Sequence, residues 1–211
     1  MTAKKIEKDT ENKILEAAKK VFVLKGLDGA RMQEIADEAG INKALLHYYF
    51  RSKDQLFMMI FKVEIGNFFP RLIPILLSKE MTFEQKICHF VENYIDLFLR
   101  NPFLPTFIIR EINRNPQMVA QFFIEAGIES NNFKQIIAGF AGELGISPKE
   151  AFHLIINTVS ACIFPFAGRP IIEQVFFDGN SVEYNYFLEE RKKFVAEFVV
   201  NSIKGRMINT K

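Results

Sequence analysis

Cysteine is scarce in this 211-residue sequence, and familiar catalytic motifs are absent. Its two cysteines, Cys88 and Cys162, lie far apart, and neither belongs to a C-x-x-C or another metal-ligand spacing. In a reducing compartment such residues are more often buried thiols than a disulfide. The sequence also has no G-x-S-x-G, no H-E-x-x-H and no phosphate-binding glycine-rich loop. We therefore expect no catalytic residues, no metal and no cofactor.

Long apolar runs are missing as well. No stretch reaches the length of about 18 uninterrupted apolar residues that a membrane-spanning helix needs. The first ten residues, which include three lysines, lack the apolar segment of a signal peptide. These absences favour a cytoplasmic protein without a membrane partner. Strand-like alternation, repeats and low-complexity segments are also absent from residue 75 onward, which favours an all-α fold.

A large charge excess is lacking too, because the net charge is only +2. Its distribution is more informative. Residues 1–53 contain 11 Lys and Arg against 8 Asp and Glu, whereas the remaining residues contain 16 against 17. The excess of positive charge therefore lies in the N-terminal part, where it can neutralise phosphate. The first eight residues are either an arm that approaches DNA through Lys4, Lys5 and Lys8 or a solvated tail.

Residues 31–57 have the pattern of two short helices joined by a tight turn. Gly40 ends the first helix, because glycine accepts the positive φ at which helices commonly stop. Asn42 can then cap a second helix over residues 43–49. The apolar face of the first helix, over residues 32–39, has the spacing i, i+3, i+4, i+7 and consists of Met32, Ile35, Ala36 and Ala39.

The second helix has few apolar residues that can point inward, chiefly Leu46 and the following Phe50. Helices that cross at roughly 90–120° over a short turn need a small residue at the close approach and an aliphatic residue in the angle. Ala36 and Leu46 meet these needs. The outward face suits a groove in nucleic acid, and it carries Lys43, Ala44, Leu45, His47 and Tyr48.

Residues 10–57 resemble the DNA-binding domain of the TetR family of bacterial transcriptional regulators. The family pattern is I-A-x-x-A-G-V-S-x-G-x-L-Y-x-Y/H-F-x-x-K-E-x-L, and the resemblance covers about a quarter of the chain. It implies a helix-turn-helix domain over residues 1–53, with helices at about 10–25, 32–39 and 43–49. The residues at the positions of this pattern are Ile35, Ala36, Ala39, Gly40, Ile41, Asn42, Ala44, Leu46, His47, Tyr49, Phe50, Lys53, Asp54 and Leu56.

The resemblance also implies a homodimer that places residues 43–49 of each subunit in a major groove of double-stranded DNA with a two-fold operator. Lys43, Tyr49 and Lys53 are expected to hold phosphate. Four departures, at Ala30, Arg31, Ala44 and His47, affect the cap of the first helix or the bases read. The expected DNA-binding residues are Arg31, Asn42, Lys43, Ala44, Leu45, His47, Tyr48, Tyr49 and Lys53.

Residues 54–211 are expected to form a larger all-helical domain that binds an effector and dimerises. Its first helix begins near Lys53, and Pro70 and Pro74 either kink it or leave it ending near Phe69. Stop and start signals such as Asn101-Pro102 and Ser147-Pro148 separate the later helices. The expected helices are 82–100, 104–113, 116–126, 130–144, 148–164, 169–177 and 182–203.

Most of the 23 phenylalanines lie in this domain, and the first explanation is a hydrophobic core. Their number also favours an aromatic cavity, and the family resemblance implies a small-molecule site there. Histidine and asparagine side chains are candidates to orient a small apolar effector, although they can equally be surface or core residues. The candidate ligand-binding residues are His89, Asn93, Tyr94, Phe98, Phe107, Phe122, Phe152, His153, Ile156 and Asn157.

Two long helices, 148–164 and 182–203, carry broad apolar stripes that must be covered. The resemblance implies a two-fold dimer through this pair, and packing within one chain is the alternative. The candidate interface residues are Ile155, Val159, Phe187, Phe194, Val195 and Phe198.

Three functions are compatible with these patterns. We favour a ligand-responsive homodimeric transcriptional regulator, a repressor that a small apolar effector releases from its operator. The second is an activator or constitutive DNA-binding protein whose C-terminal domain only dimerises, which the lack of a pocket of roughly 300 Å³ would support. The third is an interaction module or enzyme that does not bind DNA.

Overall fold

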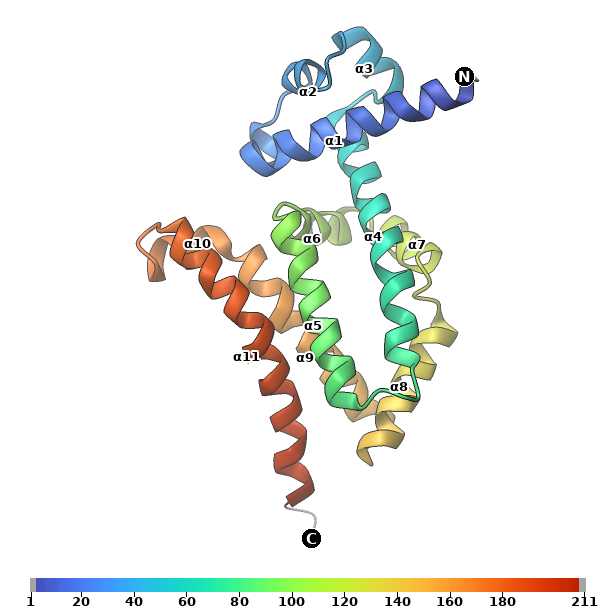
Figure 1. The fold of residues 1–211 in the computed structure, drawn as a ribbon, viewed down its shortest axis with the longest axis vertical. Helices are drawn as coiled ribbons and strands as arrows, with labels where there is room; N and C mark the ends of the chain where they lie inside the picture. Colours follow the sequence, from blue (N-terminus) through green and yellow to red (C-terminus); the bar gives the residue numbers. More distant parts are fainter. Residues whose placement is uncertain (1–2, 209–211) are drawn as a thin grey trace. The chain divides into compact units, whose positions relative to one another are not determined.

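The computed structural model describes residues 3–208, and it describes side chains for residues 7–203. The described part is helical without strands, so the predicted all-α fold is confirmed (Figure 1). The side chains of Lys4 and Lys5, which we considered for DNA contact, lie outside the described residues. The helices are α1 Ala3–Gly29, α2 Met32–Glu38, α3 Lys43–Tyr49, α4 Lys53–Leu77, α5 Phe83–Arg100, α6 Leu104–Arg114, α7 Pro116–Glu125, α8 Ser130–Leu144, α9 Pro148–Ala167, α10 Arg169–Phe176 and α11 Ser181–Ile208.

The chain forms two compact units. The first comprises Met1–Ile65 with Asn101–Leu104, and the second comprises Gly66–Arg100 with Pro105–Lys211. The division falls inside α4, whereas the sequence analysis drew the boundary at residue 53. The reason is that the first half of α4 supplies fully buried side chains to the first core, including Phe57 and Phe61.

Aromatic rings join α1 and α4 in the core of the first unit. The ring centroids of Phe22 and Phe57 are 4.6 Å apart, and Phe103 lies 5.0 Å from Phe57. Rings at such separations add to the free energy gained from area burial. The apolar residues that α1 buries in this core include Ile14, Leu15, Ala18, Val21 and Phe22.

Two helices of the chain differ from their predicted extents. α1 spans Ala3–Gly29 rather than about 10–25, with Gly26 at φ 68° and ψ 177° interrupting its helical geometry. α4 passes through Pro70 and Pro74 and ends at Leu77, so the alternative with an end near Phe69 is wrong. Phe68 and Leu72 of this part of the helix are buried, and their packing outweighs the backbone hydrogen bonds that the two prolines remove.

The second unit is a bundle in which α11 packs along α5 and α9 (Figure 1). Both cysteines are free thiols, with Cys162 buried and Cys88 half-buried. Among the described residues no group of His, Cys, Asp or Glu has a metal-binding arrangement. Of the described helices, α9 alone is long and apolar enough to cross a membrane, by length and composition. In the bundle, α9 buries Leu154 and Cys162 and leaves Phe152 exposed. A helix of this kind meets the same criteria of length and composition.

Pro165 explains how α11 is attached to α9. Proline has no N–H, so the Ala161 carbonyl lacks the donor that residue 165 would supply in a regular helix. The Arg191 side chain donates to that carbonyl at 2.7 Å. The Tyr184 hydroxyl donates to the Pro165 carbonyl at 2.6 Å, and the Tyr184 side chain is fully buried. Two residues of α11 therefore satisfy carbonyls at the C-terminal end of α9.

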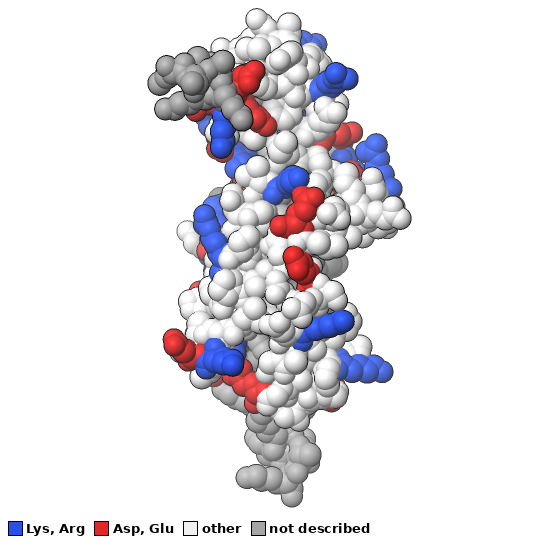
Figure 2. All heavy atoms as spheres, turned by 90° about the vertical axis from the view of Figure 1, so that its right-hand side faces the viewer, with Lys and Arg blue, Asp and Glu red and all other residues white. Residues whose placement is uncertain are grey.

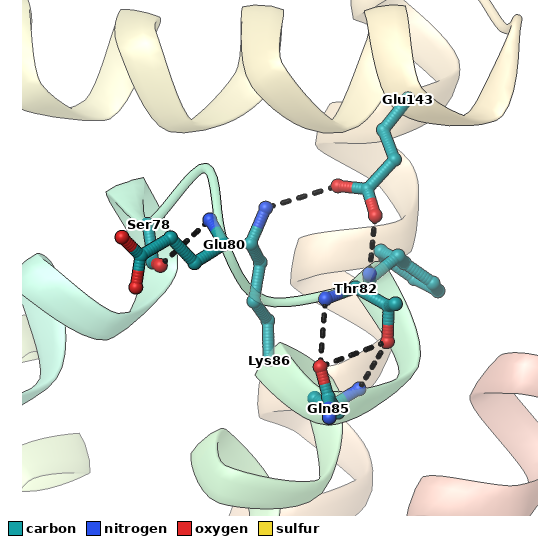
Figure 3. Close-up of polar contacts among 7 residues, drawn as sticks. Ser78, Glu80, Thr82, Gln85, Lys86 and Glu143 are labelled. Carbon is teal, nitrogen blue, oxygen red and sulfur yellow. Dashed lines mark hydrogen bonds and ion pairs between the residues drawn. The ribbon is translucent and has the colours of Figure 1, made fainter.

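A buried charge pair joins α5 to α8 (Figure 3). Lys86 is only 6% exposed, and its ammonium lies 3.0 Å from the Glu143 carboxylate. The same carboxylate accepts a hydrogen bond from the backbone N–H of Phe83, the first residue of α5. A carboxylate at a helix N-terminus is stabilised by the unpaired N–H groups there. A polar hollow of about 560 Å³ lies beside this pair, and Lys86 and Glu143, which both line it, already satisfy each other's charge.

Candidate DNA-binding surface and ligand cavity

The turn between α2 and α3 is a glycine-terminated helix end. Gly40 has φ 65°, and its N–H donates to the Asp37 carbonyl at 3.1 Å. The N–H of Ile41 donates to the Ala36 carbonyl at 3.0 Å. This pair of bonds is the Schellman arrangement, which requires the left-handed conformation that glycine adopts without strain.

Asn42 starts α3 as predicted, because its side chain accepts a hydrogen bond from the Leu45 backbone N–H at 2.8 Å. Leu46 is fully buried and fixes the inner face of α3. The outer face is open, with Tyr48 74% exposed. The residues expected to meet base edges are all exposed: Ala44, Leu45, His47 and Tyr48.

The expected phosphate ligands differ in their surroundings. Lys43 and Arg31 are exposed, and Tyr49 is half-buried with its ring 5.4 Å from that of Tyr48. Arg31 also precedes α2, and its backbone N–H donates to the Glu34 carboxylate at 3.1 Å. That bond occupies one of the N–H groups left unpaired at the start of α2. The Arg31 guanidinium is therefore not needed as the cap of this helix.

Lys53 has a structural role that the sequence did not indicate. Its ammonium donates to the Ala30 carbonyl at 3.0 Å and to the Asp28 carbonyl at 3.3 Å. Asp28 lies in the last turn of α1 and Ala30 follows the helix, so both carbonyls lie where a helix leaves its carbonyls without a partner inside the helix. Lys53 thus ties the α1–α2 connection to the start of α4, and most of its donor capacity is engaged inside the first unit.

Ion pairs fix α2 against α1. Lys25 lies 2.9 Å from Glu34, and Lys20 lies 2.8 Å from Glu38. The hydrogen bond from Lys25, followed by that from the Arg31 backbone, lowers the pKa of the exposed Glu34 carboxyl. On the face shown in Figure 2, positive and negative side chains are interspersed among uncharged ones. Attraction to DNA would therefore rest on a few local cations rather than on a large positive field.

A cavity of about 220 Å³ lies within the second unit. Gly127 forms part of its wall at φ 96°, and an added Cβ there would lie 3.0 Å from the Ile73 side chain. The lining consists of neutral residues from α4, α5, α7, α8, α9 and the α7–α8 connection: Phe69, Ile73, Leu76, Ile87, Phe90, Tyr94, Phe123, Gly127, Ile128, Asn132, Phe133, Ile136, Phe140, Leu154, Ile155, Thr158 and Val159.

Three of the lining residues have polar side chains. Thr158 donates its hydroxyl to the Leu154 carbonyl at 2.8 Å, and Asn132 donates its amide to the Gly127 carbonyl at 2.9 Å. Tyr94 packs its ring against Phe90 and Phe98, at 5.2 and 5.0 Å. Burial raises the pKa of Tyr94 far above its ordinary value, so its hydroxyl stays protonated.

Of the ten expected ligand residues, Tyr94 is the one that lines this cavity, and the others lie off it. Helical phase is the reason, because Phe98 and Phe107 point into the bundle core while several neighbours point outward. Residues of α4 and α8, which line much of the wall, carried no signal beyond apolar spacing. The outward-pointing or half-buried residues are His89, Asn93, Phe122, Phe152, His153, Ile156 and Asn157.

An exposed apolar stripe runs along α11. Val182 and Tyr186 are four residues apart, as are Phe194 and Phe198, and Glu190 lies between the two pairs. Each of the four apolar residues is at least 61% exposed. The six expected interface residues lie in different surroundings in the structure. Phe194 and Phe198 lie on this stripe, whereas Val195 is 2% exposed and packs inside the bundle. The remaining three are half-buried, and two of them line the cavity: Phe187, Ile155 and Val159.

Comparison with known proteins agrees with this arrangement. A family model described as bacterial regulatory proteins, tetR family, matches residues 14–59, which include α2, the turn and α3. Over these residues the chain has the sequence of a TetR-family DNA-binding domain. The matched range also contains the start of α4, residues 53–59, which belongs to the first compact unit.

Two curated relatives are similar to this chain over the same N-terminal part. The HTH-type transcriptional activator FasR of Mycolicibacterium smegmatis is 37% identical over 59 residues, which are 28% of this chain and 27% of FasR. The HTH-type transcriptional repressor NicS of Pseudomonas putida is 37% identical over 59 residues, 28% of each chain. The chain thus matches little more than a quarter of the length of these relatives.

The whole fold has a counterpart among solved structures. The transcriptional regulator FadR of Bacillus subtilis, in complex with stearoyl-CoA, superposes with a TM-score of 0.57 at 20% identity. The match covers 89% of this chain and 96% of that one. At this identity the likeness shows a shared fold.

Proposed function

We propose that this TetR-family protein is a homodimeric transcriptional regulator in the cytoplasm, a repressor that leaves double-stranded DNA when a small apolar effector fills the cavity. The observation that carries the proposal is the outer face of α3. It exposes Lys43, Leu45, His47 and Tyr48 on a helix whose position is fixed by Asn42 and the buried Leu46.

The chemistry of that face suits a major groove. Lys43 and Arg31 supply positive charge for phosphate, which positions a protein on DNA without reading its sequence. Ala44 and Leu45 can meet the methyl group of thymine, and His47 can hydrogen-bond base edges. Two copies related by a two-fold axis would read half-sites about 34–36 Å apart.

α4 is the element that can transmit ligand binding. It begins in the first unit and continues as one helix into the second, where Phe69, Ile73 and Leu76 line the cavity. A ligand that fits only one position of these side chains would favour one position of α4. The spacing of the two α3 helices in a dimer would change with it.

The relatives do not decide the sign of regulation, because one is named an activator and the other a repressor at equal identity. The cavity is smaller than the roughly 300 Å³ that we set as the mark of a ligand site. That limit applies to drug-sized ligands, and a cavity of about 150 Å³ already binds benzene. We therefore retain ligand control and propose a smaller effector.

The test begins by recovering the DNA that the full chain selects from genomic fragments. Fluorescence anisotropy then compares Leu45→Ala with Leu24→Ala, which removes the same atoms from an 80% exposed residue of α1. We expect Leu45→Ala to weaken specific binding about fivefold or more and Leu24→Ala to leave it unchanged. Equal affinities of both variants and the wild type would refute the DNA-reading role of α3.

Ligand control has a separate measurement. Compounds that raise the melting temperature are titrated into the protein–DNA complex, and DNA is titrated into the protein–ligand complex. Because coupling between two sites is reciprocal, each ligand should weaken the other by the same factor. A stabilising compound that binds without changing DNA affinity would support the alternative of a second domain that only dimerises.

A further inference from the structure

We infer that the cavity takes a neutral, largely apolar molecule carrying one hydrogen-bonding group, which the Tyr94 hydroxyl holds; the inference rests on the proposed ligand control. Candidate chemical classes are small ketones and esters with an aromatic or branched aliphatic body. Three observations support this choice: the unpartnered hydroxyl, the absence of charge from the lining, and the volume.

The Tyr94 hydroxyl has no hydrogen-bond partner among the residues whose side chains the structure describes. It is also not among the fully enclosed unpartnered atoms, of which the described part of the chain has one, the Arg191 Nε. The hydroxyl therefore keeps accessible surface, and it belongs to a residue of the cavity wall. The other two polar side chains of the wall already donate to the backbone.

The ring contacts of Tyr94 do not need the hydroxyl. Phe68, Phe90 and Phe98 surround the ring at centroid distances of 5.5, 5.2 and 5.0 Å. A phenylalanine would make the same contacts, whereas an unsatisfied buried hydroxyl costs about 1–3 kcal/mol. A ligand atom that accepts a hydrogen bond from the hydroxyl removes this cost, and the bond fixes the orientation of the ligand.

The lining excludes an ionised ligand group at the inner wall. None of its residues is Asp, Glu, Lys, Arg or His. An ionised carboxylate or ammonium placed among such side chains would lose its hydration without gaining a counter-charge. The ligand part that enters the cavity is therefore uncharged.

Volume limits the size of that part. The cavity of about 220 Å³ exceeds the ~150 Å³ that accommodates benzene, and proportional scaling gives ~9 non-hydrogen atoms. Propiophenone, sec-butylbenzene and hydrocinnamate are suitable probes because they have similar size. They differ at one group, which is a carbonyl, a hydrocarbon branch and a carboxylate respectively.

The experiment measures the affinity of each probe for the full chain by calorimetry or by displacement of an environment-sensitive dye. We expect propiophenone and sec-butylbenzene to bind and hydrocinnamate to bind at least tenfold more weakly. In Tyr94→Phe the ratio of ketone to hydrocarbon affinity should fall about fivefold, the value of one hydrogen bond. Hydrocarbon affinity should stay within about twofold, because the ring and its packing remain.

Matched variants locate the effect. Tyr48→Phe makes the same change in the first unit and should leave the affinity ratio unchanged. Ile155→Phe adds volume to the cavity wall and should weaken all neutral probes, whereas Ile124→Phe makes that change at an exposed residue of α7 and should not. Melting temperatures of the variants show that each is folded.

Several results would overturn the inference: no neutral probe binds the wild type, the carboxylate binds as tightly as the ketone, or Tyr94→Phe leaves the affinity ratio unchanged. DNA release is measured separately. Tyr94-dependent binding without an effect on DNA would leave the inference intact and contradict the proposed control. If an effector released DNA equally well from the wild type and from Tyr94→Phe, the proposed control would stand and the inference about Tyr94 would be contradicted.

Discussion

Lys43 and Lys53 have the same side chain and flank the same helix, yet their surroundings assign them different roles. Lys43 is exposed on α3, whereas Lys53 donates to the carbonyls of Asp28 and Ala30. A lysine that is engaged by backbone carbonyls holds the fold, and an exposed lysine on a groove-facing helix is free to meet phosphate. The two functions can be separated by substitution.

Lys53→Met should lower the free energy of unfolding by about 1–3 kcal/mol, because two partly buried carbonyls lose a charged donor. Lys43→Met should change it by less than about 0.5 kcal/mol and should instead reduce the slope of log affinity for DNA against log salt by about one unit. Urea unfolding and anisotropy at several salt concentrations measure the two quantities. If Lys53→Met reduced the slope and left stability unchanged, its structural role would be refuted.

The sequence predicts which residues of α3 are buried better than it predicts which residues line the cavity. Leu46 and Phe50 were expected to be buried and are, because a two-helix motif leaves few choices for the inner face. His89 and Asn93 were chosen for the cavity because they are polar, but both lie on the outer side of α5. Tyr94, the next residue, faces inward because each helical residue turns the side chain by about 100°. The side of a helix that faces the cavity depends on where the neighbouring helices lie, and the sequence alone does not give their positions.

At the level of elements, local signals determine where most helices lie. α8 has its predicted bounds, Ser130–Leu144, because Gly145 adopts φ 64° directly after it. α9 starts as predicted, since Ser147 and Glu150 form a reciprocal cap. The end of α4 could not be predicted, because tertiary packing carries this helix across Pro70 and Pro74. α1 loses its helical geometry at Gly26, whose φ is 68°, next to its predicted end at residue 25.

The junction of α9 and α11 shows how a helix break becomes an attachment point, and it predicts a specific coupling. Arg191→Met should cost about 1.5–3 kcal/mol in the wild type, because the Ala161 carbonyl loses its charged donor. In a Pro165→Ala background the new N–H can satisfy that carbonyl, so the cost of Arg191→Met should fall by about 1 kcal/mol. A double-mutant cycle of urea unfolding measures the difference.

Lys193→Met provides the control for this cycle, because Lys193 lies on the same helix with a largely exposed side chain. Its cost should be small and the same in both backgrounds. Equal costs of Arg191→Met with and without Pro165 would mean that Arg191 stabilises the junction through its contacts with other groups, such as the Phe187 ring.

At the level of the whole molecule, α11 has more apolar surface than one bundle can bury. Its inner face packs on α5 and α9 through buried residues such as Leu188 and Val199. Its outer stripe, from Val182 to Phe198, remains exposed in the single chain. Large exposed apolar side chains gathered on one helix favour an interaction surface. A second copy of the chain is the occupant that the proposed function requires, because operators with two half-sites are read by two-fold dimers.

Phe194→Asp combined with Phe198→Asp should therefore convert the protein to a monomer, because each carboxylate would be buried without a partner in the interface. Sedimentation equilibrium measures the mass, and anisotropy on a full operator and on one half-site measures the consequence for DNA. The double variant should lose its preference for the full operator while keeping the weak half-site affinity, since α3 is untouched. Ile124→Asp, a charge placed at a 46% exposed residue of α7, is the control and should stay dimeric. A Phe194 and Phe198 variant that remains a dimer with unchanged operator affinity would place the subunit interface on another face of the second unit.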